Sequence, residues 1–194
     1  MRIRVKICGI TTVSDALLAA AAGADAIGVV LASPSPRVVT PDRAREIFAA
    51  VPPFMTTVAV TSTDRQDDLA AILFSRPDAV QVGGDVELPR DAGVRVIRML
   101  SPGDAIRDDC DAVIVDGSRG TGRAFDPEYA RECVTASRVP VILAGGLDPR
   151  NVAGAIRAVR PYAVDVCSGV ETAPGVKDER LVRAFVKACR TTEL

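Results

Sequence analysis

Apolar and polar positions alternate along the chain with two different periods. At the start, Ile3, Val5 and Ile7 alternate with charged residues, and this period of two predicts a half-buried strand that ends on Cys8. Further short runs rich in β-branched residues predict seven more strands, over residues 27–31, 56–60, 79–82, 94–99, 112–115, 140–143 and 163–166.

Amphipathic or Ala-rich stretches separate most of these runs. They predict helices near residues 13–22, 41–50, 64–74, 126–136, 149–158 and 178–189. The connections around 84–92 and 101–107 are too short or too rich in proline for long helices. A weak internal repeat supports the alternation of strand and helix, because Asp25, Asp78 and Asp111 each precede the apolar residues of a predicted strand.

Eight strands alternating with helices are compatible with a closed barrel or with a doubly wound open sheet. The dinucleotide-binding glycine pattern does not follow the first strand, and the glycines from Gly117 to Gly122 come only after the sixth. The strand count favours an α/β fold with a single (β/α)8 TIM-barrel domain over residues 1–194. Such barrels typically have about 250 residues, so this one is compact, with some shortened connections.

The composition and net charge of the chain limit the classes of ligand that we expect. Of the 194 residues 48% are hydrophobic, and 24 basic residues against 25 acidic ones give a formal net charge of -1. We therefore expect a small-molecule ligand rather than nucleic acid or a membrane. Without a secretory segment or a long apolar run, we expect a cytoplasmic protein.

The cysteine and histidine content limits the catalytic chemistry that we expect. The five cysteines form no C-x-x-C pair, which fits reduced thiols. The chain has no histidine and no cluster of metal-ligand spacing, so we expect no metal site. Proton transfer must then use carboxylates, thiols, lysine or tyrosine.

In a barrel, the residues that follow each strand meet on one face. Glycine and serine dominate these positions, and the loops after the seventh and eighth strands contain Gly145, Gly146, Ser168 and Gly169. Such loops can bring backbone N–H groups close to an anion, although either pair could simply form a tight turn. Both pairs together favour a phosphate site.

Cys8 and Asp116 each end a predicted strand and should face the same pocket. Cys8 could instead be a packed thiol and Asp116 a turn or capping residue. As base and acid, the thiol would need a lowered pKa and the carboxyl a raised one. Lys6 and Arg37 are the nearest plausible cations to lower the pKa of the thiol; Lys6 could also be a strand residue paired with an acid, and Arg37 a solvated loop residue. We place both with the substrate-binding residues.

Four blocks, in the same order, resemble the signatures of phosphoribosylanthranilate isomerases. They are Lys6-Ile7-Cys8-Gly9-Ile10-Thr11; Val115-Asp116-Gly117-Ser118 with Gly120-Thr121-Gly122 and Phe125-Asp126; Leu143-Ala144-Gly145-Gly146-Leu147 with Asn151-Val152; and 164–171 with Pro174-Gly175-Val176-Lys177-Asp178. The resemblance implies a (β/α)8 barrel of the tryptophan pathway. It also implies an Amadori rearrangement of N-(5-phosphoribosyl)anthranilate to 1-(2-carboxyphenylamino)-1-deoxyribulose 5-phosphate, without a cofactor.

The resemblance also implies roles for individual residues. Asp116 would protonate the furanose ring oxygen, and the Cys8 thiolate would then remove the proton from C2. Arg37 would pair with the anthranilate carboxylate, for which a guanidinium fork is suited. The backbone around Gly145–Gly146 and Ser168–Gly169 would hold the phosphate, and Asp165 would lie by the sugar hydroxyls.

Three positions depart from the family pattern. Gly83 stands where the family usually has histidine, Cys167 where it often has serine, and Val38 where it has an aromatic residue. These differences affect the packing around the anthranilate ring and the catalytic efficiency. Another phosphosugar-handling barrel isomerase, or a non-catalytic phosphosugar-binding module, remains an alternative, and the chain could be a monomer or a homodimer. Intact Cys8 and Asp116 argue against the non-catalytic module.

Overall fold

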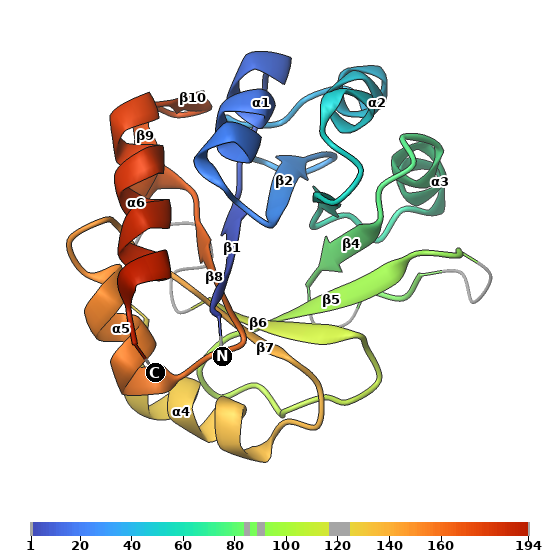
Figure 1. Ribbon diagram of the computed structural model, residues 1–194. Helices are drawn as coiled ribbons and strands as arrows, with labels where there is room; N and C mark the ends of the chain where they lie inside the picture. Colours follow the sequence, from blue (N-terminus) through green and yellow to red (C-terminus); the bar gives the residue numbers. More distant parts are fainter. Residues whose placement is uncertain (1, 84–85, 89–91, 117–124, 194) are drawn as a thin grey trace.

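Eight parallel strands close into a barrel in sequence order (Figure 1). The computed structural model describes residues 2–83, 86–88, 92–116 and 125–193. The closure of β8 onto β1 confirms the predicted barrel over the open sheet. The barrel strands are β1 (Arg4–Ile7), β2 (Ala26–Val30), β3 (Thr56–Val60), β4 (Ala79–Val82), β5 (Arg95–Leu100), β6 (Ala112–Asp116), β7 (Val141–Ala144) and β8 (Ala163–Val166).

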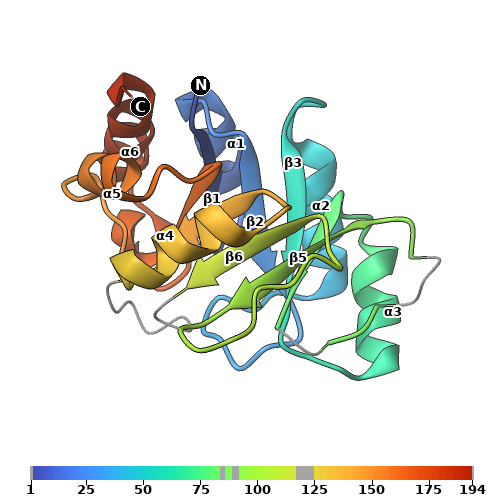
Figure 2. The ribbon, with the colours of Figure 1, turned by 90° about the horizontal axis from the view of Figure 1, so that it is seen from below.

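The helices cover the barrel unevenly. Along the chain, no helix of the described residues lies between β4 and β6, so the shortened connections are confirmed. Figure 2 shows β5 and β6 side by side, joined by irregular chain. The helices elsewhere are α1 (Val13–Ala22), α2 (Pro41–Ala50), α3 (Gln66–Phe74), α4 (Pro127–Ala136), α5 (Val152–Val159) and α6 (Glu179–Thr191). The termini of these helices lie within a few residues of the predicted ones.

A small hairpin after β8 was not expected from the hydrophobic pattern. One turn of 3-10 helix (Ser168–Val170) leads into β9 (Glu171–Ala173), which pairs antiparallel with β10 (Val176–Lys177). Gly175, with φ of +81°, lies between these two strands in a conformation that favours glycine. The hairpin brings the charged side chains of Glu171 and Lys177 to the end of the barrel.

Capping residues set the ends of the helix that follows the first strand. The Thr12 hydroxyl accepts a hydrogen bond from the Asp15 N–H at 3.1 Å, which satisfies one of the unpaired donors of the first turn. The helix α1 then ends at Gly23, whose φ of +92° is a left-handed C-cap. These two caps set where α1 begins and ends.

The internal aspartate repeat has a structural explanation. Asp25, Asp78 and Asp111 each accept a backbone N–H from the strand before them, at 2.8, 2.7 and 2.8 Å. The N–H of each aspartate donates to the backbone of that same preceding strand. Each aspartate therefore ties two neighbouring strands together at the end of the barrel opposite the carboxyl ends of the strands.

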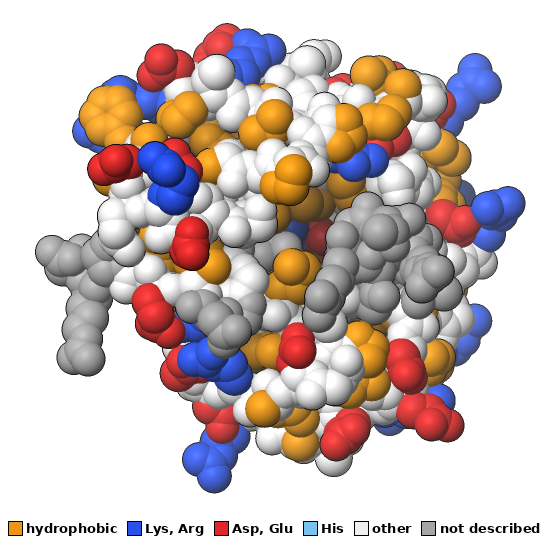
Figure 3. Space-filling view, turned by 180° about the vertical axis from the view of Figure 1, so that it is seen from behind, with side chains coloured by type: hydrophobic (Ala, Val, Ile, Leu, Met, Phe, Trp, Pro, Cys, Tyr) orange, Lys and Arg blue, Asp and Glu red, His pale blue; other side chains and the backbone are white. Residues whose placement is uncertain are grey.

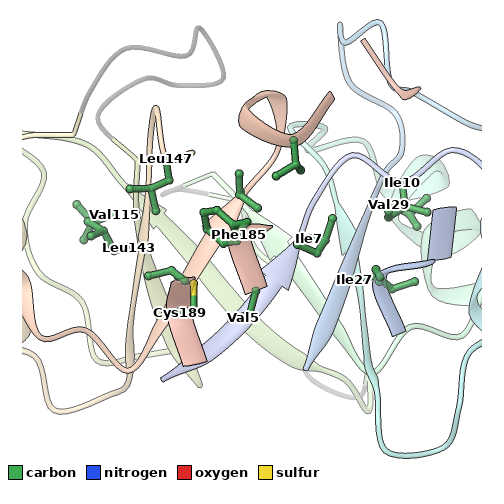
Figure 4. Close-up of a cluster of buried hydrophobic side chains, with 14 of the residues drawn as sticks. Val5, Ile7, Ile10, Ile27, Val29, Val115, Leu143, Leu147, Phe185 and Cys189 are labelled. Atoms are coloured by element: carbon green, nitrogen blue, oxygen red, sulfur yellow. The ribbon is translucent and has the colours of Figure 1, made fainter. Parts of the chain in front are cut away.

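The core has two layers. The outer layer lies between the barrel and the helices, where Phe185 and Cys189 of α6 lie beside Val5 and Ile7 of β1 (Figure 4). The inner layer fills the barrel with apolar side chains from β3 to β8, namely Val58, Ala79, Ile97, Ala112, Ile114, Ile142, Ala144 and Ala163.

The half-buried prediction for the first strand was wrong. Lys6, on the face opposite Val5 and Ile7, points into the barrel and is only 3% exposed. Strands of a closed parallel barrel are buried on both faces, and an acidic partner inside the barrel makes this position acceptable for a lysine.

On the molecular face shown in Figure 3, acidic and basic side chains are interspersed among apolar and polar ones. Within the described residues, no helix has the length and apolar content needed to cross a membrane.

Candidate active site

A pocket of about 380 Å³ lies at the carboxyl ends of the barrel strands. Every strand contributes to its lining, either with its last residues or with the loop that follows it. The pocket brings together seven of the nine residues expected in the site: Cys8, Arg37, Asp116, Gly145, Gly146, Asp165 and Ser168. The described lining includes neither Lys6 nor Gly169.

The backbone holds Cys8 firmly at the end of β1. Its N–H donates to the Val166 carbonyl of β8 at 2.8 Å. Gly9, with φ of +72°, then turns the chain toward α1. A Cβ at Gly9 would lie 2.6 Å from the Arg37 side chain and 2.7 Å from the Cys167 sulfur, so the turn also needs glycine for space. Cys8 itself is 7% exposed.

Lys6 lies beneath the pocket rather than in its wall. Its ammonium donates to the Asp165 carboxylate at 2.9 Å and to the Gln81 side-chain oxygen at 3.0 Å, and all of these groups are buried. Burial favours the neutral amine of Lys6, but the charges of Asp165 and Cys8 outweigh it and raise its pKa. Burial raises the pKa of Asp165, against the attraction of Lys6. The structure thus gives Lys6 the acid partner that its sequence context left open.

The surroundings of Cys8 favour its thiolate. A hydrogen bond from Cys167 lowers the pKa of Cys8, and the positive charges of Lys6 and Lys177 lower it further against the effect of burial. The same hydrogen bond, together with burial, raises the pKa of Cys167. The surroundings therefore favour the thiolate at Cys8 and the protonated thiol at Cys167, which is the condition for Cys8 to act as a base near neutral pH.

Arg37 reaches across the pocket to the hairpin after β8. Its Nε and Nη2 atoms donate to the Glu171 carboxylate at 2.9 and 2.6 Å, a forked ion pair in which the two side chains are 15% and 4% exposed. This pair fixes the guanidinium and leaves its Nη1 without a hydrogen-bond acceptor among the described residues. A substrate carboxylate would meet Arg37 through this end.

Glu171 holds three further groups besides Arg37. Its Oε1 accepts from the Lys177 ammonium at 2.7 Å and from the Gly175 N–H at 3.2 Å, and lies 3.9 Å from the Cys167 sulfur. The side chain of Lys177 is fully buried. The hydrophobic pattern did not identify Glu171, Lys177, Cys167 or Gln81 as site residues. For Glu171 and Lys177, the only sequence signal is their place in the last family block.

The loops after β7 and β8 offer backbone donors. Gly145 and Gly146 have φ of +98° and +63°, and the Asn151 amide donates to the Gly146 carbonyl at 2.8 Å. Within the described residues, no backbone hydrogen bond uses the N–H of Gly146, Ser168 or Gly169. This arrangement suits an anion such as phosphate.

Gly169 has a packing reason to be glycine. A Cβ at this position would lie 2.0 Å from the Leu147 carbonyl oxygen. Its side-chain position is therefore filled by the neighbouring loop rather than by a ligand, and only its backbone could serve an anion.

Asp116 lies in the pocket wall at the end of β6, two strands away from β8. It ends β6, where it pairs in register with Ala144 of β7, and it is half-buried. Its charge is close enough to act on the pKa of Asp165. The wall nearby includes Val82 and Met99, and the following residues 117–124, which include three glycines of the family block, lie outside the described residues.

The position expected to carry an imidazole in the family is bare. A Cβ at Gly83 would meet no atom of the described residues within 4 Å. Among the described residues, no group of three or more cysteine, aspartate and glutamate side chains could hold a metal ion.

A thiolate, a carboxylate and glycine-rich loops after the last two strands of a closed barrel are typical of barrel enzymes that act on small phosphorylated molecules. A family model described as N-(5'phosphoribosyl)anthranilate (PRA) isomerase matches residues 5–188. The chain belongs to this family. The resemblance stated from the sequence is thereby confirmed.

Individual relatives agree. An N-(5'-phosphoribosyl)anthranilate isomerase of Methanoregula boonei is 56% identical over 191 residues, covering 98% of each chain. The enzyme of the same name from Pseudomonas fluorescens is 44% identical over 205 residues, covering 97% of this chain and 98% of the relative.

Solved structures agree as well. The phosphoribosyl anthranilate isomerase of Thermus thermophilus superimposes with a TM-score of 0.84 at 37% identity, covering 96% of this chain and 98% of that one. Another, in complex with reduced 1-(o-carboxyphenylamino)-1-deoxyribulose 5-phosphate, has a TM-score of 0.79 at 33% identity, with the same coverage. The expected isomerase function in tryptophan biosynthesis is confirmed over the two alternatives.

Proposed function

We propose that this pocket rearranges N-(5-phosphoribosyl)anthranilate to 1-(2-carboxyphenylamino)-1-deoxyribulose 5-phosphate, with Asp116 as the acid and Cys8 as the base. The observation that supports these roles is the placement of the two groups at the ends of β6 and β1, around one pocket. The chemistry needs one group that gives a proton and one that takes a proton, and it needs no redox step.

The first step is opening of the furanose ring. Asp116 gives its proton to the ring oxygen, the bond between that oxygen and C1 breaks, and the anthranilate nitrogen supplies the electrons for an iminium ion. Asp116 is left as a carboxylate. Its place at the end of β6, in the lining of the pocket, gives the sugar ring access to it.

The second step is proton removal from C2. The Cys8 thiolate takes this proton and the electrons neutralise the iminium ion, which gives an enolamine that tautomerises to the ketone. Lys6 and Lys177 stabilise the negative charge on the sulfur before the step. Asp165, paired with Lys6 in the pocket floor, would lie by the sugar hydroxyls.

Binding energy comes from the two ends of the substrate. The phosphate would take the N–H groups of Gly146, Ser168 and Gly169, which suit an anion without adding positive side chains. The carboxylate of the anthranilate would pair with the guanidinium of Arg37, which Glu171 already orients. Groups preoriented in this way lose less freedom on binding.

We also propose that residues 1–194 are one barrel domain, monomeric or homodimeric, that works in the cytoplasm on a phosphorylated small molecule without a cofactor. Reduced cysteines and a pocket open to small ligands support this setting.

The test is a direct assay on purified protein in the presence of EDTA. The fluorescence of phosphoribosylanthranilate should fall with time, and the product should carry a ketone. Activity that EDTA removes and a divalent cation restores would overturn the proposal of metal-free acid–base catalysis. Cys110→Ser, which changes a thiol outside the pocket, is the matched control and should retain activity.

A further inference from the structure

Two cysteines lie side by side at the ends of neighbouring strands. The parallel register pairs Lys6 with Asp165 and Ile7 with Val166, so Cys8 and Cys167 are next in line. The hydrogen bond from the Cys8 N–H to the Val166 carbonyl, at 2.8 Å, continues this register past the end of β1. Neighbouring strands lie about 4.8 Å apart, which falls within the Cα separation of about 4.4–6.8 Å that a disulfide spans.

The side chains meet as well as the backbones. Each sulfur acts on the pKa of the other, lowering that of Cys8 and raising that of Cys167, which requires the two groups to lie close together. The Cys167 sulfur lies over Gly9, since a Cβ there would be 2.7 Å from it. Both residues line the pocket, so a small reagent that enters the pocket reaches both sulfurs.

The three other cysteines have no such arrangement. Cys133 and Cys189 lie on the buried faces of helices α4 and α6 and are 0% and 1% exposed. Cys110 is half-buried in the segment before β6, and burial raises its pKa. None of these three lines the pocket.

We propose that Cys8 and Cys167 form an oxidation site, in which a hydroperoxide that enters the pocket converts the two thiols into a disulfide. The site shares Cys8 with the proposed isomerase mechanism, but its product, the disulfide, can be detected whether or not the protein turns over substrate.

The first step is attack of the Cys8 thiolate on the peroxide oxygen. A sulfur–oxygen bond forms and the oxygen–oxygen bond breaks. Hydroxide leaves and becomes water with the proton that the Cys8 thiol released to the solvent when it ionised; Cys8 becomes a sulfenic acid. The electrostatic surroundings that favour the thiolate direct the peroxide to Cys8 and not to Cys167.

The second step is attack of the Cys167 sulfur on the Cys8 sulfur. Water leaves with the sulfenic oxygen and the Cys167 proton, and the disulfide forms. In total the two thiols lose two electrons and hydrogen peroxide is reduced to two waters. The negative charge of Cys8, which raises the pKa of Cys167, is lost in the first step. The oxidation of one sulfur therefore makes the other more reactive, while Lys177 still favours its thiolate.

The experiment uses the full-length protein, reduced and then freed of reductant. Hydrogen peroxide is added in small excess, the protein is unfolded in N-ethylmaleimide, and its intact mass is measured. We expect three labelled thiols in place of five. After trypsin, a cross-linked species should join the fragments 7–37 and 158–177, which contain only Cys8 and Cys167 as cysteines. Dithiothreitol should restore five labels.

Two variants serve as controls. In Cys167→Ser no cross-link can form, and Cys8 should instead gain one or two oxygen atoms, the second irreversibly. In Cys110→Ser the cross-link should form as in the parent protein. During peroxide treatment, the Cys8 thiol that N-ethylmaleimide can label should disappear at least about tenfold faster than the Cys110 thiol, because a thiolate reacts and a protonated thiol does not.

Three results would overturn the proposal. They are sulfinic acid on Cys8 in the parent protein with Cys167 still labelled, a cross-link between any other pair, and five intact thiols under peroxide that fully oxidises N-acetylcysteine. Because each readout is a mass, a chain without isomerase activity would give the same answer. Failure of the proposed function and failure of this site are therefore distinguishable.

Discussion

The two sides of the pocket hold their reacting groups by different means. On the side of β1 and β8, Cys8 lies among two buried ion pairs, Lys6 with Asp165 and Glu171 with Lys177. On the side of β4 to β6, no helix of the described residues connects the strands, and Asp116 stands at the end of its strand near apolar wall residues.

The difference follows from the chemistry of the two groups. A thiol serves as a base only if the protein stabilises its anion before the substrate arrives, so the base side needs a network of charges. The acid has to lie within reach of a ring oxygen, which requires access more than a network. We therefore expect substitutions on the acid side to act locally, and those on the base side to affect binding, pH dependence and stability together.

The largest effect should come from Asp116→Asn. The amide keeps the size of the side chain but has no proton to give the ring oxygen, so kcat should fall by at least about 10²–10⁴-fold. Product affinity and melting temperature should stay close to those of the parent protein. The control is Asp67→Asn, an exposed residue in the first turn of α3. A fall in kcat of only a few-fold would mean that another group supplies the proton.

On the base side, Cys8→Ser should lower kcat by about 10²–10⁴-fold, because a hydroxyl is far harder to ionise than a thiol. Product binding measured in parallel shows whether the pocket is intact. Cys110→Ser, outside the pocket, should retain kcat. A Cys8→Ser enzyme within a few-fold of the parent would make Cys8 a packed thiol and leave the base unidentified.

The predictability of the two sides from the sequence also differs. The barrel, Cys8 and Asp116 follow from strand ends, because each of these residues closes an apolar run and strand ends meet on one face. Glu171 and Lys177 could not be placed in this way. They belong to strands of three and two residues, too short for a hydrophobic period, and their partners lie far away in sequence, as Arg37 does.

Lys6 and Gly169 show a second limit. The alternating charges of the first strand indicate a polar face. In the closed barrel Lys6 of this face points inward, and its burial is acceptable only because Asp165 of β8 pairs with it. In the sequence, Gly169 looks like part of an anion-binding loop. The structure shows that this position is glycine because a side chain would collide with the Leu147 carbonyl. This contact joins two loops that are distant in the sequence, so no local sequence pattern predicts it.

Glu171→Gln should weaken the ion pairs that Glu171 makes with Arg37 and Lys177 on the base side of the pocket. The amide cannot neutralise both Arg37 and the buried Lys177, and since hydrogen bonds to charged groups contribute about 1.5–3 kcal/mol, KM should rise by about 10–100-fold. The melting temperature should also fall, because the side chains of Glu171 and Lys177 are 4% and 0% exposed. Steady-state kinetics and thermal unfolding measure the two effects.

A matched control for this prediction is Glu179→Gln. Glu179 pairs with Arg183 on the surface of α6, where the two side chains are 63% and 51% exposed, so the loss should be small in both measurements. If Glu171→Gln lowers the melting temperature and leaves KM unchanged, Glu171 supports the fold and does not position Arg37 for the substrate.

The smallest effect concerns the pH dependence of kcat/KM and the Cys167 hydrogen bond. The thiolate of Cys8 is the active form, so the rate should fall as the pH drops through the pKa of Cys8. Cys167, Lys6 and Lys177 lower that pKa. The acid limb of the pH–rate profile, where the rate falls with falling pH, should therefore lie below the ordinary pKa of cysteine, near 8.5. Cys167→Ala removes the donor and should move the limb to higher pH.

At a fixed pH below the limb, the Ala variant should lose about tenfold in kcat/KM for each pH unit of displacement. Above both limbs the two enzymes should converge. Cys167→Ser keeps a donor and should displace the limb less than Cys167→Ala does. The rate of alkylation of Cys8 by iodoacetamide, followed against pH, reports the same titration without substrate. An acid limb at the same pH in the parent and in Cys167→Ala would show that the charges of Lys6 and Lys177 suffice to hold the thiolate, and that the neighbouring thiol contributes nothing to the base.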